Sequence, residues 1–246
     1  MKKIRADILL IEKGLVESRE KAKRLILAGK VLAGKQPVNK PGKEYDINTE
    51  FKIIEKNRFV SRGGNKLEFF LQETNIDINN KICFDIGCST GGFTDCLIQR
   101  GAKKVYAVDV GKGILDWKLR NDRRVIVKEG VNARYLNNNI IEELCDIGVM
   151  DVSFISVEKI IPNLYNYLKP NGFLIVLIKP QFEAGKKFIE KGGVVKDINI
   201  HRFVISKIKK FCTEQKFEVL NILPSKVKGA KKGNQEYFML LKKNES

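Results

Sequence analysis

The chain has 246 residues, with 46 lysines and arginines against 29 aspartates and glutamates, which gives a formal net charge of +17 at pH 7. Its hydrophobic content of 43% is typical of a soluble globular protein and excludes the disordered and fibrous classes. So large a positive charge attracts polyanions, so the candidate partners are RNA, DNA or an anionic membrane surface. A lysine-rich bias in composition is the alternative explanation.

The N-terminal sequence and the cysteine pattern indicate the cellular compartment. No uninterrupted apolar run is long enough to cross a bilayer, and Glu12 and Lys13 end the first short apolar stretch, so we expect neither a membrane span nor a signal peptide. The five cysteines form no CxxC pair, and the single histidine, His201, cannot build a multi-histidine site. We therefore predict a cytoplasmic protein with no metal ion and no disulfide framework.

The first part of the chain is expected to form a small α+β module. Apolar residues at helical spacing predict two amphipathic helices, at residues 5–15 and 18–28. Gly14 is expected to end the first helix, and Ser18 is a good N-cap for the second. Short strands are predicted within residues 30–38 and at residues 50–54.

Basic side chains gather on and around the second predicted helix, with few acids between them. We interpret them as an RNA-binding surface, and the alternative is a solvated charged face of the kind that many helices carry. Together with an arginine that follows the module, the predicted RNA-binding residues are Arg5, Arg19, Lys21, Lys23, Arg24, Lys30 and Arg62.

The pattern RADxLLxxxGLxxSRxxAxxLIxxGKV resembles the small RNA-binding module known as the S4 domain. It departs from that module at Ala33-Gly34-Lys35, where a strand ending in Asn-Gly is usual. The resemblance implies an RNA-binding domain at residues 1–56. A linker is then predicted at residues 57–61 and a second domain at residues 62–246.

From Gly63 onwards, short apolar strands alternate with helices. The predicted strands are residues 81–87, 104–110, 125–131, 146–152, 173–179, 217–223 and 237–241, and the predicted helices begin at residue 66 and cover residues 92–100, 156–168 and 199–214. Such alternation predicts an α/β fold with a mostly parallel, Rossmann-like sheet covered on both faces, and the two closing strands could form an antiparallel hairpin at one edge.

The glycine-rich run DIGCSTGGFTD, residues 85–95, follows the first strand of this sheet and leads into a helix. The dinucleotide fingerprint GxGxxG is absent, and an acid at the strand end suits a ligand with an amino group and a sulfonium better than a pyrophosphate. This favours S-adenosylmethionine over NAD. A carboxylate at the end of the second strand can bind ribose hydroxyls, and Asn132 could reach the adenine edge or be a turn residue. The predicted cofactor-binding residues are Asp85, Gly87, Ser89, Thr90, Gly91, Gly92, Phe93, Asp109, Val110, Asn132 and Asp151.

Charged residues from distant parts of the chain could converge beside this site. The fourth strand ends in Asp151-Val152-Ser153-Phe154, without the prolines that enzymes methylating base amino groups usually have there. Lys179 ends the fifth strand, Lys66 precedes the first strand, and Glu236 opens the last one. Solvated ion pairs at strand ends are the alternative explanation.

The motifs SRGGNKL, DIGCSTGGFTD, DVGKGILDWKLRND, DVSFIS, LIKPQFE, KGGVVKD and GNQEYF together resemble the TlyA or hemolysin A family of rRNA ribose 2'-O-methyltransferases, which join an S4 domain to an FtsJ-like methyltransferase domain. The resemblance implies that Lys66, Asp151, Lys179 and Glu236 form a catalytic tetrad, with Lys179 as a general base or as a positioning donor. It also implies methylation of a cytidine in large-subunit rRNA, with or without a second one in small-subunit rRNA. Phe59 stands where the family often has a linker tryptophan. The alternative functions are a non-catalytic RNA-binding or ribosome-assembly protein and, less favoured, a hemolysin.

Overall fold

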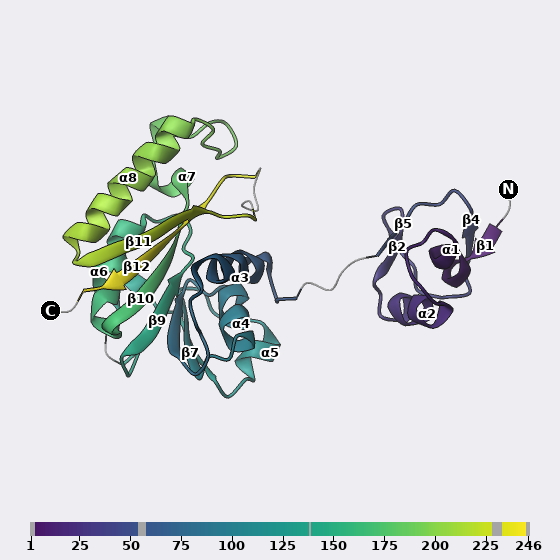
Figure 1. Cartoon of the computed structure of the whole chain (residues 1–246), viewed down its shortest axis with the longest axis horizontal. Coiled ribbons are helices and arrows are strands. Elements are labelled where there is room, and N and C mark those ends of the chain that lie inside the picture. Colours follow the sequence, from purple (N-terminus) through teal and green to yellow (C-terminus); the bar gives the residue numbers. More distant parts are fainter. Residues whose placement is uncertain (1–2, 54–57, 138, 228–232, 245–246) are drawn as a thin grey trace. The chain divides into compact units, whose positions relative to one another are not determined.

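A computed structural model describes residues 3–53, 58–137, 139–227 and 233–244 of the chain. The chain divides into two compact units, Met1–Asn57 and Arg58–Ser246 (Figure 1). The predicted start of the linker at Asn57 and the predicted strand end at residue 54 lie outside the described residues.

The first unit contains two helices and two small antiparallel sheets. Its elements are β1 (Lys3–Arg5), α1 (Ala6–Glu12), α2 (Arg19–Leu27), β2 (Val31–Ala33), β3 (Gln36–Pro37), β4 (Glu44–Asp46) and β5 (Phe51–Ile53). Strands β1 and β4 pair in one sheet, and β2 lies between β3 and β5 in the other. Apolar side chains of both helices pack with those of β2 and β5 in one buried core.

Both predicted helices of this unit form, with shifted ends. The first begins at Ala6 because Arg5 ends β1, where it pairs with Glu44 of β4. Ser18 caps α2 as predicted, since its Oγ accepts a hydrogen bond from the Lys21 N–H at 3.2 Å. Strands β1 and β4 were not predicted, because three residues carry too little alternation to be recognised.

The second unit is built on a seven-stranded sheet with the strand order β11-β12-β10-β9-β6-β7-β8. Its strands are β6 (Ile82–Ile86), β7 (Lys104–Asp109), β8 (Val125–Glu129), β9 (Cys145–Met150), β10 (Leu168–Ile178), β11 (Phe217–Pro224) and β12 (Tyr237–Lys243). Strands β6 to β10 pair in parallel, and β12 pairs antiparallel with both β10 and β11. The predicted mostly parallel sheet with an edge hairpin is therefore confirmed.

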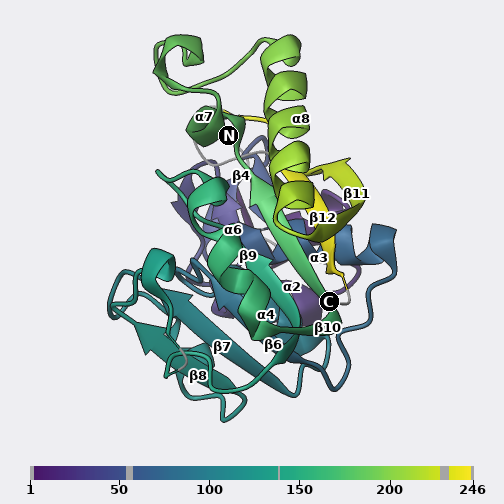
Figure 2. The ribbon, with the colours of Figure 1, turned by 90° about the vertical axis from the view of Figure 1, so that its left-hand side faces the viewer.

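Helices cover both faces of this sheet (Figures 1 and 2). One face carries α3 (Arg62–Thr74), α4 (Gly92–Gln99) and α5 (Trp117–Arg120), and the other carries α6 (Ile161–Leu164) and α8 (Ile198–Glu214). Along β10, Leu174 and Val176 join the core under α6 and α8, and Ile175 and Leu177 join the core under α3 and α4. Burial on both faces explains why the strands have continuous apolar sequences. None of the described helices is long and apolar enough to cross a membrane.

The prediction of one continuous helix at residues 156–168 is wrong. The segment forms three single turns, η2 (Val157–Lys159), α6 and η3 (Tyr165–Tyr167), and Leu168 already begins β10. Pro162 explains the break, because it has no N–H for the helical ladder and its ring clashes with the carbonyl four residues earlier. The short helices α5 and α7 (Pro180–Glu183) were missed, since four residues are too few to show helical periodicity.

Residues 58–61, predicted as part of a linker, are integrated into the second unit. Phe59 is 2% exposed and packs against Gly64, where an added Cβ would lie 2.3 Å from the ring. Arg58 lies over the same ring at 4.9 Å and forms an ion pair with Glu68 of α3 at 2.8 Å. The phenylalanine that replaces the tryptophan of the family is thus a core residue beside the start of α3.

Candidate active site

Three adjoining cavities lie at the carboxyl ends of the parallel strands, which is where open α/β sheets bind ligands. The β7 cavity, of about 470 Å³, is lined among others by Asp109, Val110, Asn132 and Arg134. The α3 cavity, of about 270 Å³, is lined among others by Ser61, Arg62, Lys66, Asp85 and Lys179. The α7 cavity, of about 500 Å³, is lined among others by Arg134, Phe154, Gln181 and Phe182. The β7 and α3 cavities share Gly87, Ser89, Asp151 and Ser153.

The glycine-rich loop after β6 forms the wall between the first two cavities. Gly87 has a φ of 80°, and a Cβ at this position would lie 2.6 Å from the carbonyl oxygen of Asp151. Only glycine therefore lets the loop approach the end of β9 so closely. Ser89, Thr90, Gly92 and Phe93 also line the α3 cavity. Gly91, which was predicted to bind the cofactor, is not among the lining residues.

Asp85 is the penultimate residue of β6, is buried and has an incomplete set of hydrogen bonds. Its Oδ2 accepts from the Thr94 N–H at 2.9 Å and from the Thr94 hydroxyl at 2.6 Å. Its Oδ1 is buried and has no hydrogen-bond partner among the described residues. Burial raises the pKa of Asp85 to about 7 against the effect of these two hydrogen bonds. A ligand that donates to Oδ1 would remove the cost of leaving it unpaired.

Asp109, at the end of β7, fixes the loop on the opposite side of the β7 cavity. Its Oδ2 accepts from the Ser89 N–H at 2.8 Å and its Oδ1 accepts from the Gly111 N–H at 2.7 Å. Each carboxylate oxygen has a second lone pair that can accept from a ligand hydroxyl. Val110 beside it is 72% exposed. Asn132 lines the cavity, and its Oδ1 also accepts a hydrogen bond from the Arg134 N–H at 3.1 Å, so it is a cavity residue and a turn residue at once.

The four residues of the predicted tetrad form two ion pairs. Lys179, at the end of β10, pairs with Asp151 at 2.5 Å and donates to Ser153 Oγ at 2.9 Å. Lys66, on α3, pairs with Glu236 at 2.5 Å. Lys66, Asp151 and Lys179 all line the α3 cavity, and both lysines are 8% exposed. The fold thus brings three of the four residues to one small cavity, and Glu236 reaches it only as the ion-pair partner of Lys66.

The basic residues predicted to bind RNA differ in their surroundings. Arg5 and Arg19 both bind the buried carboxylate of Asp7, each at 3.0 Å, and the hydrogen bond from Arg5 is the main reason why the pKa of Asp7 is lowered. Both arginines therefore also have a structural role, because they pair with this buried carboxylate. Lys21 pairs with Glu17 at 2.8 Å, whereas Arg24 is exposed. Arg62 is exposed at the mouth of the α3 cavity.

Several cavity residues were not predicted from the sequence. Ser153 and Phe154 follow Asp151, and Gln181 and Phe182 follow Lys179, so they lie in the motifs DVSFIS and LIKPQFE directly after predicted strand ends. Their position directly after predicted strand ends is the feature of the sequence that could have identified them as cavity residues. Among the described residues, no group of three or more His, Cys, Asp or Glu side chains could hold a metal ion. All five cysteines are buried and free.

Comparisons with known proteins agree with this geometry. Residues 59–243 match the FtsJ-like methyltransferase family, and residues 4–51 match the S4 domain. The chain is 37% identical over 243 residues to the 16S/23S rRNA (cytidine-2'-O)-methyltransferase TlyA of Mycobacterium tuberculosis, covering 98% of this chain and 90% of that protein. It is 41% identical over 236 residues to Hemolysin A of Brachyspira hyodysenteriae, covering 96% and 98%. A solved structure of a "putative hemolysin" from Streptococcus thermophilus is 43% identical, has a TM-score of 0.75 and covers 100% of this chain and 90% of that one.

Proposed function

The chain belongs to the FtsJ-like methyltransferase family, and on this premise we propose that it transfers a methyl group from S-adenosylmethionine to the ribose 2'-hydroxyl of a cytidine in ribosomal RNA, with large-subunit rRNA as the first candidate. The observation that carries this proposal is the pair of lysine–carboxylate contacts, Lys179 with Asp151 and Lys66 with Glu236, beside the cavity behind the glycine-rich loop. The activity named for the Mycobacterium tuberculosis relative supports the choice of acceptor.

The residues at the strand ends fit S-adenosylmethionine. The unpaired Oδ1 of Asp85 can accept from the amino group of its methionine part, and the carboxylate of Asp109 can accept from its ribose hydroxyls. Val110 and Asn132 would border its adenine in the β7 cavity. When bound, S-adenosylmethionine supplies an activated methyl group.

Lys179 would orient the attacking oxygen of the ribose. A lysine ammonium has three donors, and here Ser153 Oγ accepts from it while the Asp151 carboxylate is its ion-pair partner. A remaining donor can hold the 2'-hydroxyl oxygen in the α3 cavity, and as this oxygen takes the methyl group its proton would pass to the Asp151 carboxylate, which lines the same cavity. Holding reactants in line can contribute about 7–11 kcal/mol to the lowering of a barrier, and a fixed donor at this position would contribute in that way. Lys66, which Glu236 holds in place, would form another part of the wall of the α3 cavity.

The first unit would supply RNA affinity. It matches the S4 domain, and its second helix carries Lys23 and Arg24 with Lys30 just beyond it. The net charge of +17 favours association with the rRNA of either ribosomal subunit. On this proposal the two units divide the work, because the first binds RNA and the second binds the methyl donor.

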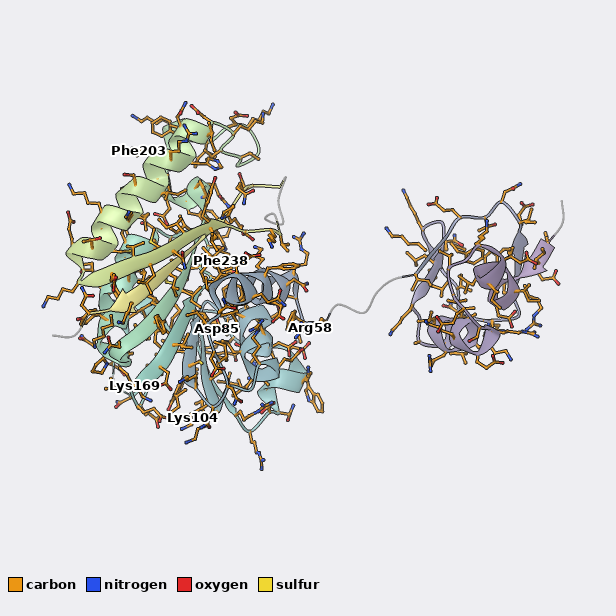
Figure 3. The ribbon with its side chains drawn as sticks, in the orientation of Figure 1. Arg58, Asp85, Lys104, Lys169, Phe203 and Phe238 are labelled. Carbon is orange, nitrogen blue, oxygen red and sulfur yellow. The ribbon has the colours of Figure 1, made fainter. Side chains whose placement is uncertain are left out.

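Replacing Lys179 tests the proposed catalytic role. We expect Lys179→Ala to lower the rate of methyl transfer to rRNA by about 100- to 10,000-fold, the range typical of a lost acid–base or orienting group, while the affinity for S-adenosylhomocysteine stays unchanged. The matched control is Lys169→Ala, which removes a lysine at the opposite end of β10 that pairs with Asp146 at 2.8 Å (Figure 3). The substrate would be rRNA from cells that lack the gene, and 2'-O-methylation would be mapped in both subunits.

The outcomes separate the proposal from its alternatives. Wild-type activity of Lys179→Ala would remove the lysine from the mechanism. RNA binding by the wild-type protein without any methylated ribose would favour a non-catalytic role in RNA binding or ribosome assembly.

A further inference from the structure

The α7 cavity has a basic lining, and the ring of Phe182 in its wall lies 5.9 Å from Lys179 Nζ. Helix α7 begins at Pro180, directly after Lys179. The cavity is lined by the basic residues Arg134, Lys159 and Lys186, and no acidic residue is among its lining residues. Its volume of about 500 Å³ is within the range of ligand pockets.

Two aromatic rings form one wall of this cavity. Phe154 is 84% exposed although it is a large apolar residue, and its φ of 65° lies in the left-handed region, which is unusual for phenylalanine. Its ring lies 5.1 Å from that of Phe182. Exposed aromatic faces beside basic side chains suit nucleobases, which stack on them.

Two buried polar atoms of the cavity residues have no hydrogen-bond partner among the described residues. They are the side-chain oxygen of Gln181, Oε1, and the Nε of Arg134. One is an acceptor and the other is a donor. Leaving such atoms unpaired destabilises the folded protein, so their retention points to a ligand that pairs with them.

We propose that the α7 cavity receives the base of the nucleoside whose ribose meets Lys179, and that Gln181 is a specificity-determining residue that accepts a hydrogen bond from the exocyclic amino group of cytosine. This inference rests on the proposed function. Uracil has a carbonyl oxygen in place of that amino group, so Gln181 could pair with it only by turning its amide and replacing Oε1 by Nε2. Arg134 Nε donates to an acceptor of the same base.

The choice between cytosine and uracil tests this assignment. After the methylated nucleotide has been mapped, two rRNA transcripts would carry cytidine or uridine at that position, and kcat/KM would be measured for both. We expect the wild-type protein to prefer the cytidine transcript by about 10- to 100-fold, the discrimination typical of one well-formed base contact. Gln181→Leu should bring the ratio close to one, and Gln181→Glu, which keeps acceptor oxygens and has no donor, should keep the preference.

The ratio of the two transcripts is independent of how much of a variant is folded. The matched control is Gln72→Leu, which replaces an exposed glutamine of α3 that lines none of these cavities. An unchanged ratio in Gln181→Leu, an equal loss of preference in Gln181→Leu and Gln181→Glu, or a wild-type ratio of one would overturn the inference and leave the proposed function intact. Absence of methylated ribose with the wild-type protein would instead contradict the proposed function.

Discussion

Asp85 combines complete burial with an unpaired carboxylate oxygen, Oδ1, which the proposed cofactor would meet with its amino group. Its pKa of about 7 means that in the protein alone Asp85 holds a proton at mildly acidic pH. A cationic amino group at Oδ1 favours the carboxylate, so binding of such a ligand should release that proton. The α-amino group of a peptide has a pKa of about 7.7–8.0, and the amino group of a ligand with a free carboxylate beside it is more basic, so it keeps its charge below pH 7.

We therefore expect the affinity for S-adenosylhomocysteine to rise by about tenfold per pH unit between pH 5 and 7 and to level off above pH 7. The raised pKa also means that the folded state binds more protons than the unfolded chain, so the contribution of Asp85 to stability falls as the pH rises from about 4 to 7. Calorimetric titration in buffers of different ionisation enthalpy measures the proton release. Asp85→Asn should remove both pH dependences.

The control for Asp85→Asn is Asp122→Asn, because Asp122 lines none of the three cavities. The hydrogen bond from Arg124 also keeps the pKa of Asp122 below its usual range, so this carboxylate stays ionised between pH 5 and 7. A wild-type affinity that does not change between pH 5 and 7 would show that no cationic group meets Asp85.

Single residues differ in how far the sequence could define them. The positions of Asp85, Asp151 and Lys179 at strand ends follow from the motifs, and the structure places all three around the α3 cavity. The sequence could not predict which of these side chains contact one another, because an ion pair such as that of Lys66 with Glu236 joins residues 170 positions apart. The clamp of Arg5 and Arg19 on Asp7 was missed for the same reason, since a basic helix face gives no sign of which arginine is already bound.

At the scale of elements, the start of α3 depends on a close approach between a helix and a ring. Ser61 caps this helix, and Gly64 in its first turn lies against Phe59. A Cβ at Gly64 would be 2.3 Å from the ring, whereas the nearest atom to a Cβ at Gly63 is Ser61 Oγ at 3.3 Å. The two neighbouring glycines therefore make a matched pair for substitution.

We expect Gly64→Ala to lower the free energy of unfolding by about 1–3 kcal/mol, because an overpacked core must displace the ring. Gly63→Ala should change it by less than about 1 kcal/mol, since the gain in helix propensity offsets the tighter contact. Urea unfolding of the two variants measures the difference. Equal stabilities would mean that Phe59 moves aside without cost and does not anchor α3.

Elements were predictable where they are long or strongly apolar. The strands of the large sheet were all predicted, and for the central ones the reason is that burial on both faces gives continuous apolar runs, whereas β11 at the edge is only partly buried. The segment at residues 156–168 has helical spacing of apolar residues and still forms three turns, since Pro162 interrupts the ladder and Leu168 is drawn into β10 beside Cys145 of β9. Tertiary pairing overrides local periodicity in such segments.

At the scale of the whole molecule, the distribution of charge decides between a binding surface and a bias in composition. Both explanations are consistent with a net charge of +17. The two explanations predict different results when equal numbers of positive charges are removed from different places on the first unit. Only a side chain that contacts a phosphate releases counterions there, so only its removal should change the salt dependence of the affinity.

We expect the triple variant Lys23→Gln, Arg24→Gln, Lys30→Gln to weaken binding to rRNA and to reduce the slope of log affinity against log salt by about 0.7 for each lost contact with a single-stranded phosphate. The control removes three exposed charges elsewhere in the same unit, as Lys35→Gln, Lys40→Gln, Lys52→Gln. Affinity for S-adenosylhomocysteine should be unchanged in both variants, since the cavities that would hold it are lined by residues of the second unit. Equal salt slopes for the two triple variants would show that net charge alone attracts the RNA, and the basic face of α2 would then be an ordinary solvated surface.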